Sequence, residues 1–256
     1  MEVHHHSHTA SGSDSHRGRK KWTHYFWEFM MLFLAVFCGF LAEYQLEHKI
    51  EKDREKQFIR SLAYDLKADT ARIRRIIVTR TVREASLDSI TRLLNSNSPS
   101  EHSTDLYFHA VSAARTISFR FLPNDGTMLQ LKNSGAVRLI RNRAIADSIA
   151  KYDVSIRGAV RQGELEETLI HDYRSAAPMI FNALIFEQML DTNNNPHRIS
   201  GEKPALLPFE KKELDIYNYK LYSMKALNKA IRRDIRFLLQ QAENLLSVLN
   251  EKYHLE

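Results

Sequence analysis

The chain has 256 residues, which is enough for a membrane anchor and one substantial folded domain. Only 8 glycines and 6 prolines are present, so a turn-rich β-sandwich or barrel is disfavoured and a few long helices are predicted. Residues 44–256 hold most of the net charge of +6, as interspersed Lys, Arg, Asp and Glu without an uninterrupted basic tract, which indicates a solvated mixed-charge surface and no nucleic-acid partner.

Residues 1–21 are predicted to form a disordered, basic tail that is rich in histidine. Imidazole is a metal ligand, but Ser and Gly around these side chains fix no geometry, and a disordered tail or a partial tag explains the same composition. We therefore predict no metal or cofactor site here. The histidines are His4, His5, His6, His8 and His16.

Residues 22–43 are predicted to be a transmembrane helix. The stretch from residue 22 to 42 would measure roughly 31 Å as a helix, which matches the hydrocarbon core of a bilayer. Trp22 and Trp27 lie at one end and Tyr44 at the other, as is typical of interfacial aromatic side chains. A cleaved signal peptide is the alternative, but Phe40 stands where its cleavage site needs a small residue, and Phe37 disfavours lipoprotein processing at Cys38.

The orientation of this anchor rests on the charges that flank it. The preceding segment contains Arg17, Arg19, Lys20 and Lys21, and the following one contains Lys49, Lys52, Arg54 and Lys56, so the counts balance. The first group is the more tightly clustered. The only cysteine, Cys38, lies within the anchor, and a thiol-free domain suits an oxidising compartment. We expect a bacterial inner-membrane protein with a cytoplasmic N-terminus and a periplasmic C-terminal domain.

Small residues within the anchor follow the spacing of a helix-pairing face. Ala35, Gly39 and Ala42 are separated by four and three residues, which allows two helices to approach closely. Such spacings also occur by chance in apolar segments, so this hypothesis stands beside a purely lipid-facing role.

Residues 44–256 are predicted to fold as an all-α, elongated antiparallel bundle of three long helices with short helices between them. The long helices are expected at about 44–94, 142–190 and 209–253, with short ones at 104–116 and before Gly135. Gly135 is expected to close its helix in a left-handed conformation. Asn142 is the expected N-cap of the second, and Pro178 is expected to kink its far end. The third helix carries a heptad seam interrupted only by Asn228, a residue type that fixes register.

No motif in the chain indicates an enzyme. Phosphate loops, nucleophile elbows and zinc-protease patterns are absent from the sequence, and Glu251 with His254 forms a lone Glu-x-x-His where a di-iron site needs two. His171 is interpreted as a surface or core-edge side chain. Catalytic residues, cofactors and metals are therefore not predicted.

The segment from 123 to 143 is the one stretch that helical periodicity does not explain. Its polar and basic side chains beside a helix N-terminus are candidates to hold an anion, although capping and loop closure account for most of them. The candidate residues are Asn124, Asp125, Lys132, Arg138, Arg141 and Arg143.

Four stretches resemble a group of uncharacterised Bacteroidota single-pass membrane proteins with a His-rich start, one N-terminal anchor and a helical domain of unknown function. They are HHHSH (residues 4–8), KKWTHYFWEFMMLFLAVFCGFLAE (residues 20–43), EKQFIRSL (residues 55–62) and LQLKNSGAVRLIRNRAIADSI (residues 129–149). The resemblance implies a native polyhistidine segment and no particular activity.

These observations lead to one main functional hypothesis. The chain is expected to be a membrane-anchored helical module for protein–protein interaction or scaffolding at the inner membrane. Its expected partners are the lipid bilayer and either a second copy or other membrane or periplasmic proteins. A ligand-sensing bundle or an enzyme with a polar site around residues 123–143 is the alternative.

Overall fold

The computed structural model describes residues 17–115 and 120–255, with side chains from residue 22 onward. The first long helix, α1, runs from Arg17 to Leu94, and the chain divides into two compact units, Met1–Arg54 and Glu55–Glu256. Residues 17–21 are thus helical rather than part of the predicted tail, whereas residues 1–16, with their histidines, lie outside the described residues. The structure is all-helical, as predicted, and has no strand among the residues it describes.

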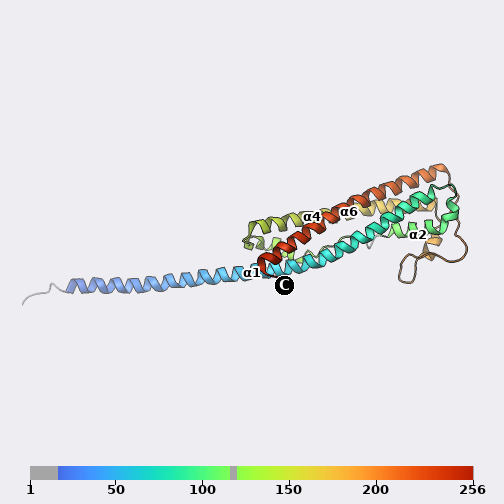
Figure 1. The fold of residues 1–256 in the computed structure, drawn as a ribbon. Helices are drawn as coiled ribbons and strands as arrows, with labels where there is room; N and C mark the ends of the chain where they lie inside the picture. Colours follow the sequence, from blue (N-terminus) through green and yellow to red (C-terminus); the bar gives the residue numbers. More distant parts are fainter. Residues whose placement is uncertain (1–16, 116–119, 256) are drawn as a thin grey trace, which may run out of the picture. The chain divides into compact units, whose positions relative to one another are not determined.

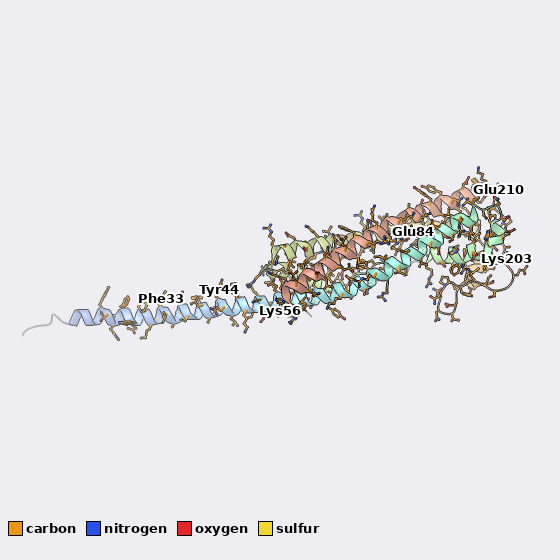
Figure 2. All side chains as sticks on the ribbon, in the orientation of Figure 1. Phe33, Tyr44, Lys56, Glu84, Lys203 and Glu210 are labelled. Carbon is orange, nitrogen blue, oxygen red and sulfur yellow. The ribbon has the colours of Figure 1, made fainter. Side chains whose placement is uncertain are left out.

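The first unit contributes the apolar part of α1. Among the described helices, α1 has one stretch near the N-terminus that is long and apolar enough to cross a membrane, and none of that stretch is buried. Phe33 is 52% exposed and Trp22 is 78% exposed. The side chain of Phe33 projects from the helix surface (Figure 2). Exposed apolar side chains gathered on one stretch are typical of a surface that contacts a membrane or another protein.

In the second unit, the described residues form the rest of α1 and eight further helical elements. They are η1 (Pro99–His102), α2 (Ser103–Ala114), α3 (Gly126–Asn133), η2 (Ala136–Leu139), α4 (Arg143–Ala176), η3 (Ala177–Met179), α5 (Ala183–Gln188) and α6 (Lys211–Tyr253). Within this unit α1, α4 and α6 lie side by side (Figure 1). The shorter elements close the space that these three helices leave open.

Helix α6 runs antiparallel to α1. Arg74 of α1 is hydrogen-bonded to Glu243 of α6 at 2.6 Å, and Asn95, just beyond the end of α1, is bonded to Asn218 at 3.0 Å. Residue numbers therefore fall along α6 as they rise along α1. The same holds between α4 and α6, where Lys220 donates to Asp172 at 3.0 Å and Gln162 donates to Asp234 at 2.6 Å.

Helices α1 and α4, in contrast, run parallel, so the antiparallel pairing expected of the long helices is found for α6 with each of them but not between α1 and α4. Tyr152 of α4 contacts Asp69, and Glu166, further along α4, contacts Arg80, further along α1. The reason is that α2 and residues 120–125 run back along α1, with the Ala113 carbonyl of α2 beside Arg83. Asn124 contacts Asp69, near the start of the second unit's part of α1. Helix α4 therefore begins at the same end of the unit as α1 does.

The predicted second long helix ends earlier than expected, at Ala176 instead of 190. Pro178 lacks a backbone N–H and its ring obstructs the preceding turn, so α4 passes into the short η3 rather than continuing with a kink. Asn182 then caps α5, its side chain accepting a hydrogen bond from the Leu184 N–H at 3.1 Å. The predicted short helix at 104–116 is α2, which starts at Ser103 after the η1 turn and ends at Ala114.

The cap predictions are confirmed at two positions. Asn142 is the N-cap of α4, with its side chain accepting from the Ile145 N–H at 3.3 Å. Gly135 has a φ of +66°, the left-handed conformation that glycine adopts without steric cost. Asp125 is the N-cap of α3, but its side chain makes no capping hydrogen bond.

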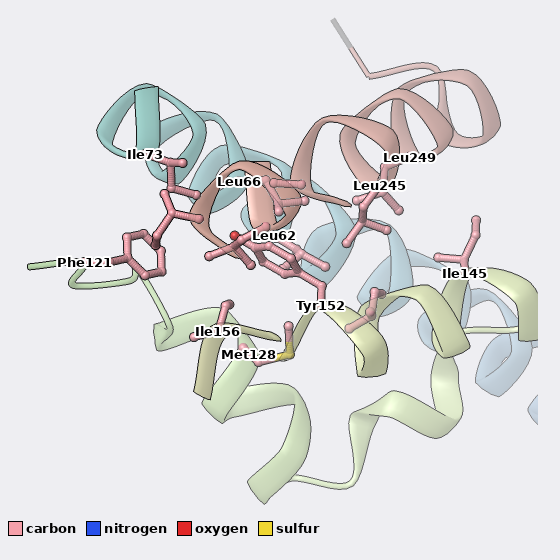
Figure 3. Close-up of a cluster of buried hydrophobic side chains, with 14 of the residues drawn as sticks. Leu62, Leu66, Ile73, Phe121, Met128, Ile145, Tyr152, Ile156, Leu245 and Leu249 are labelled. Atoms are coloured by element: carbon pink, nitrogen blue, oxygen red, sulfur yellow. The ribbon is translucent and has the colours of Figure 1, made fainter. Parts of the chain in front are cut away.

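The heptad seam of α6 is confirmed in full. Every predicted seam position is buried, including Asn228, which is 0% exposed. The seam packs into two hydrophobic clusters shared with α1 and α4. Figure 3 shows the first cluster, where Leu245 and Leu249 of α6 lie near Tyr152 of α4 and Leu62 of α1.

Replacing Asn142 with alanine is expected to lower the free energy of unfolding by about 1 kcal/mol, because the first turn of α4 loses its side-chain acceptor. Urea unfolding of the detergent-solubilised protein, followed by circular dichroism, measures the change. Asn142→Ser is the matched control and should retain most of the stability, since serine is also a good N-cap. Equal losses in both variants would contradict the capping role.

Candidate functional site

A buried polar layer separates the two hydrophobic clusters of the second unit. It consists of Arg80 and Arg83 of α1, Glu166 of α4 and Asn228 of α6, each at most 5% exposed. On every long helix the layer falls between residues of the first cluster and residues of the second. A layer of this kind is costly unless its charges are paired and hydrogen-bonded.

Glu166 is the centre of the polar layer. Its two carboxylate oxygens accept hydrogen bonds from Arg80 at 2.9 and 2.7 Å, a bidentate pair, and Oε1 also accepts from Arg83 at 2.6 Å. Asn228 completes the layer: its Oδ1 accepts from the Arg80 guanidinium at 3.2 Å, and its Nδ2 donates to the Arg80 carbonyl at 3.1 Å. Three helices are thereby cross-linked at one level.

The polar layer holds two cations and one anion, so its groups carry an excess positive charge. Burial lowers the pKa of Arg83 to about 10, while the Glu166 carboxylate acts in the opposite direction. At neutral pH the guanidinium therefore remains charged. Its Nε donates to the carbonyl of Ala113 at 3.0 Å, which fixes the last turn of α2 against α1.

A tyrosine pair adjoins the polar layer. The Tyr217 hydroxyl donates to the Tyr173 hydroxyl at 2.8 Å, and both side chains are buried. Burial raises the pKa of Tyr173 to about 12, partly offset by the hydrogen bond from Tyr217 and by nearby Arg83, and it raises the pKa of Tyr217 well above its usual value. Both phenols therefore stay protonated at neutral pH.

An apolar cavity of about 430 Å³ lies beyond Tyr173, between α2, α4, η3 and α5; we call it the alanine pocket. Charged side chains occur at Arg115, Arg174 and Glu187, and Arg174 donates a hydrogen bond to the Ala114 carbonyl in the wall. Pockets of this size with an apolar lining and few polar groups are typical binding sites for apolar groups. The apolar lining consists of Ala110, Val111, Ala114, Ala177, Pro178, Ala183, Phe186 and Leu190.

The polar residues predicted around 123–143 are placed mostly in structural roles. The Asn124 backbone N–H and Nδ2 both donate to Asp69 Oδ1 at 2.9 Å, which ties the returning chain to α1. Burial raises the pKa of Asp69, and the hydrogen bonds from Asn124, which lower it, offset this effect only in part. Arg138 lies in η2, and Arg143 is the first residue of α4.

Two of the predicted residues do line a common cavity. Asp125 and Lys132 border a hollow of about 440 Å³ between α3 and α4. There Lys132 pairs with Asp153 at 3.1 Å, and Arg157 pairs with the same carboxylate. Asn124, Arg138, Arg141 and Arg143 do not line this hollow.

The predicted helix-pairing residues share one side of α1 by helical geometry. Ala35, Gly39 and Ala42 are spaced by about one turn each, and apart from the helix's own backbone no atom of the described residues lies within 4 Å of the position that a Gly39 Cβ would take. Phe33 stacks with Phe37 on the opposite side, their ring centroids 6.0 Å apart. The small-residue face is therefore open for close approach of another helix.

The polar layer was missed at Arg80, Arg83 and Glu166, although the sequence contains a signal for it. The buried positions of α1 alternate spacings of three and four, and Arg80 and Arg83 occupy this series between Ile76 and Leu87. A charged residue at a seam position is expected to find a buried partner. Only Asn228 of the layer was identified from its place in a seam.

Neither metal-ligand geometry nor similarity to known proteins identifies a further functional site in the described residues. Within residues 22–115 and 120–255, no group of three or more His, Cys, Asp or Glu side chains is arranged to hold a metal ion. Comparison of the chain with known protein families, curated proteins and solved structures finds no match.

Proposed function

We propose that the chain is a membrane-anchored helical module that binds a partner protein through the alanine pocket. The apolar stretch of α1 is the anchor, with the N-terminus cytoplasmic and the second unit periplasmic, at a bacterial inner membrane. The partner inserts an apolar side chain into the pocket. The function is scaffolding or complex assembly rather than catalysis.

The alanine pocket is the observation that carries this proposal. Interfaces concentrate their binding free energy where an apolar or aromatic anchor of one protein fills a pocket of the other. The pocket wall is held by two cross-links, from Arg83 to Ala113 and from Arg174 to Ala114, so it is formed before any partner binds. A preformed pocket reduces the ordering cost of association.

The exposed apolar stretch of α1 supports the anchor. Membrane insertion provides the non-aqueous environment that its side chains otherwise lack, and the backbone hydrogen bonds of a continuous helix satisfy the requirement of the bilayer interior. The face formed by Ala35, Gly39 and Ala42 offers an additional surface for pairing with a second copy.

Filling the alanine pocket is expected to abolish partner binding. Ala183, an exposed lining residue, is replaced by tryptophan, and a photoreactive phenylalanine analogue at Glu187 reports contact in intact cells. The parent protein should form a crosslinked adduct, and Ala183→Trp should weaken binding roughly 30-fold, the equivalent of losing about 2 kcal/mol at an interface hot spot.

Ala150→Trp is the matched control, because Ala150 is exposed on α4 and does not line the pocket. Its adduct should equal that of the parent. An unchanged adduct in Ala183→Trp, or equal loss in both variants with their helical circular dichroism intact, would show that the pocket is not the binding site.

A further inference from the structure

The second unit has one strongly basic end, the end at which the chain enters it. Glu55, the first residue of the unit, is 5% exposed, and its Oε1 accepts from the Arg141 backbone N–H at 3.0 Å and from the Tyr253 hydroxyl at 2.6 Å. The start of the unit, the turn between η2 and α4, and the last turn of α6 therefore meet at this end.

Exposed cations cluster around that meeting point. Among the described residues the acidic side chains there are fewer. Asp147 and Glu251 are exposed, Asp65 is half-buried, and the Glu55 carboxylate is buried. We call this surface the basic end. Its exposed cations are Arg60, Lys67, Arg138, Arg141, Arg143 and Lys252.

The basic end also contains a hollow, and none of the described residues that line it carries a carboxylate. It measures about 500 Å³ and is lined by Arg60, Tyr64, Lys67 and His254, together with Ala63 and Leu255. Guanidinium, ammonium and phenol groups are the donors that hold phosphate oxygens. The hollow is thus chemically suited to a phosphate-bearing headgroup.

The opposite end of the second unit has the reverse balance. Around α5 and the start of α6, basic side chains such as Lys203, Lys211 and Lys212 are outnumbered by acidic ones. The unit is therefore electrically polar along its length. The exposed acidic residues there are Glu101, Glu187, Asp191, Glu202, Glu210 and Asp215.

We propose that the basic end is a docking surface for anionic phospholipid headgroups of the membrane that holds the anchor. This inference rests on the proposed anchor. Glu55 follows Tyr44 by only eleven residues, which in any conformation span at most about 40 Å, so the basic end is tethered close to the headgroups. Anionic lipids attract basic segments within about a Debye length of the surface. Docking orients the second unit, leaving the acidic end and the alanine pocket toward the soluble compartment.

The test uses the full chain in nanodiscs of pure phosphatidylcholine or of phosphatidylcholine with phosphatidylglycerol. Cys38→Ser removes the native thiol, and Ser148→Cys, an exposed site on α4, carries a fluorescent donor for transfer to an acceptor-labelled lipid. Energy transfer is expected to be higher in the anionic discs. It should fall when salt shortens the Debye length from about 10 Å at 0.1 M to about 3 Å at 1 M.

Two charge-matched triple variants separate a specific surface from net charge. In the first, Arg138, Arg141 and Arg143 are each replaced by glutamine. This variant should lower the ratio of docked to undocked protein roughly a hundredfold at low salt, because each basic residue near an anionic surface contributes about fivefold to that ratio. In the second, Lys203, Lys211 and Lys212 are replaced by glutamine at the opposite end, and the parent response should persist.

The outcomes distinguish this inference from the anchor on which it rests. Insertion into both discs with equal energy transfer overturns lipid docking and leaves the anchor standing. Equal loss in the two triple variants also overturns it, because net charge alone would then explain the response. Failure to insert into either disc overturns the anchor, and lipid docking with it.

Discussion

Glu166→Gln is expected to destabilise the second unit by about 3–5 kcal/mol, the largest effect that we expect from a single substitution of unchanged side-chain size in this fold. The substitution keeps the shape of the side chain but removes the only carboxylate of the polar layer, which leaves the buried Arg80 and Arg83 cations close together without their anion. For a domain of this size each kcal/mol lowers the melting temperature by about 2–4 °C, so a fall of roughly 10 °C is expected.

The neighbouring Glu167→Gln provides the control. Glu167 pairs with Arg120, but both side chains are about half exposed, and exposed pairs contribute about 0–1 kcal/mol. Thermal and urea unfolding of the two variants in the same detergent give the comparison. Similar stability of the Glu166→Gln and Glu167→Gln proteins would contradict this prediction. It would mean that the buried guanidinium groups of Arg80 and Arg83 do not depend on the Glu166 carboxylate for stability.

The second large effect is expected in the anchor. Replacing Phe33 and Phe37 with arginine places two charges near the middle of the apolar stretch, each costing about 2.5–3.5 kcal/mol for insertion. The doubly substituted chain should leave the membrane fraction and appear in the soluble or carbonate-extracted fraction. Both phenylalanines are exposed in the described structure, so the folding of the second unit should be unaffected.

Arginines at Tyr44 and His48 are the matched control, because these positions follow the apolar stretch and long basic side chains are tolerated at the membrane surface. This variant should remain membrane-bound after carbonate treatment. Retention of the Phe33→Arg, Phe37→Arg protein would remove the main support for a spanning helix.

Local sequence signals predicted much of this fold. Helical class, the α6 seam, the Asn142 cap and the left-handed Gly135 follow from spacing and from the conformational preferences of single residues. The relative direction of α1 and α4 does not, because it depends on how residues 120–125 return along the bundle to contact Asp69 and neighbouring residues. Sequence alone places no constraint on that non-local pairing.

The candidate sites show the same limit. The alanine pocket is formed where Pro178 ends α4 and the chain folds back through α5. The sequence pattern predicts a single helix to residue 190, which lacks this fold-back, so the pocket could not be predicted from it. Arg80 and Glu166 are far apart in the chain, so each resembles an ordinary surface charge until the two helices are aligned. Asn228 alone was recognisable, because a single polar residue in an otherwise apolar seam is visible within one helix.

The hydrogen bond from Tyr253 to Glu55 has a mechanical consequence. It places the chain's path from the anchor and the end of α6 at the same end of two antiparallel helices. Tension between the membrane and a partner held at the C-terminus would peel α1 from α6 one turn at a time. Tension between the membrane and a partner in the alanine pocket would instead load the helices lengthwise, against many contacts at once. If the proposed partner binds there, the alanine pocket is the attachment point at which these helices resist pulling best.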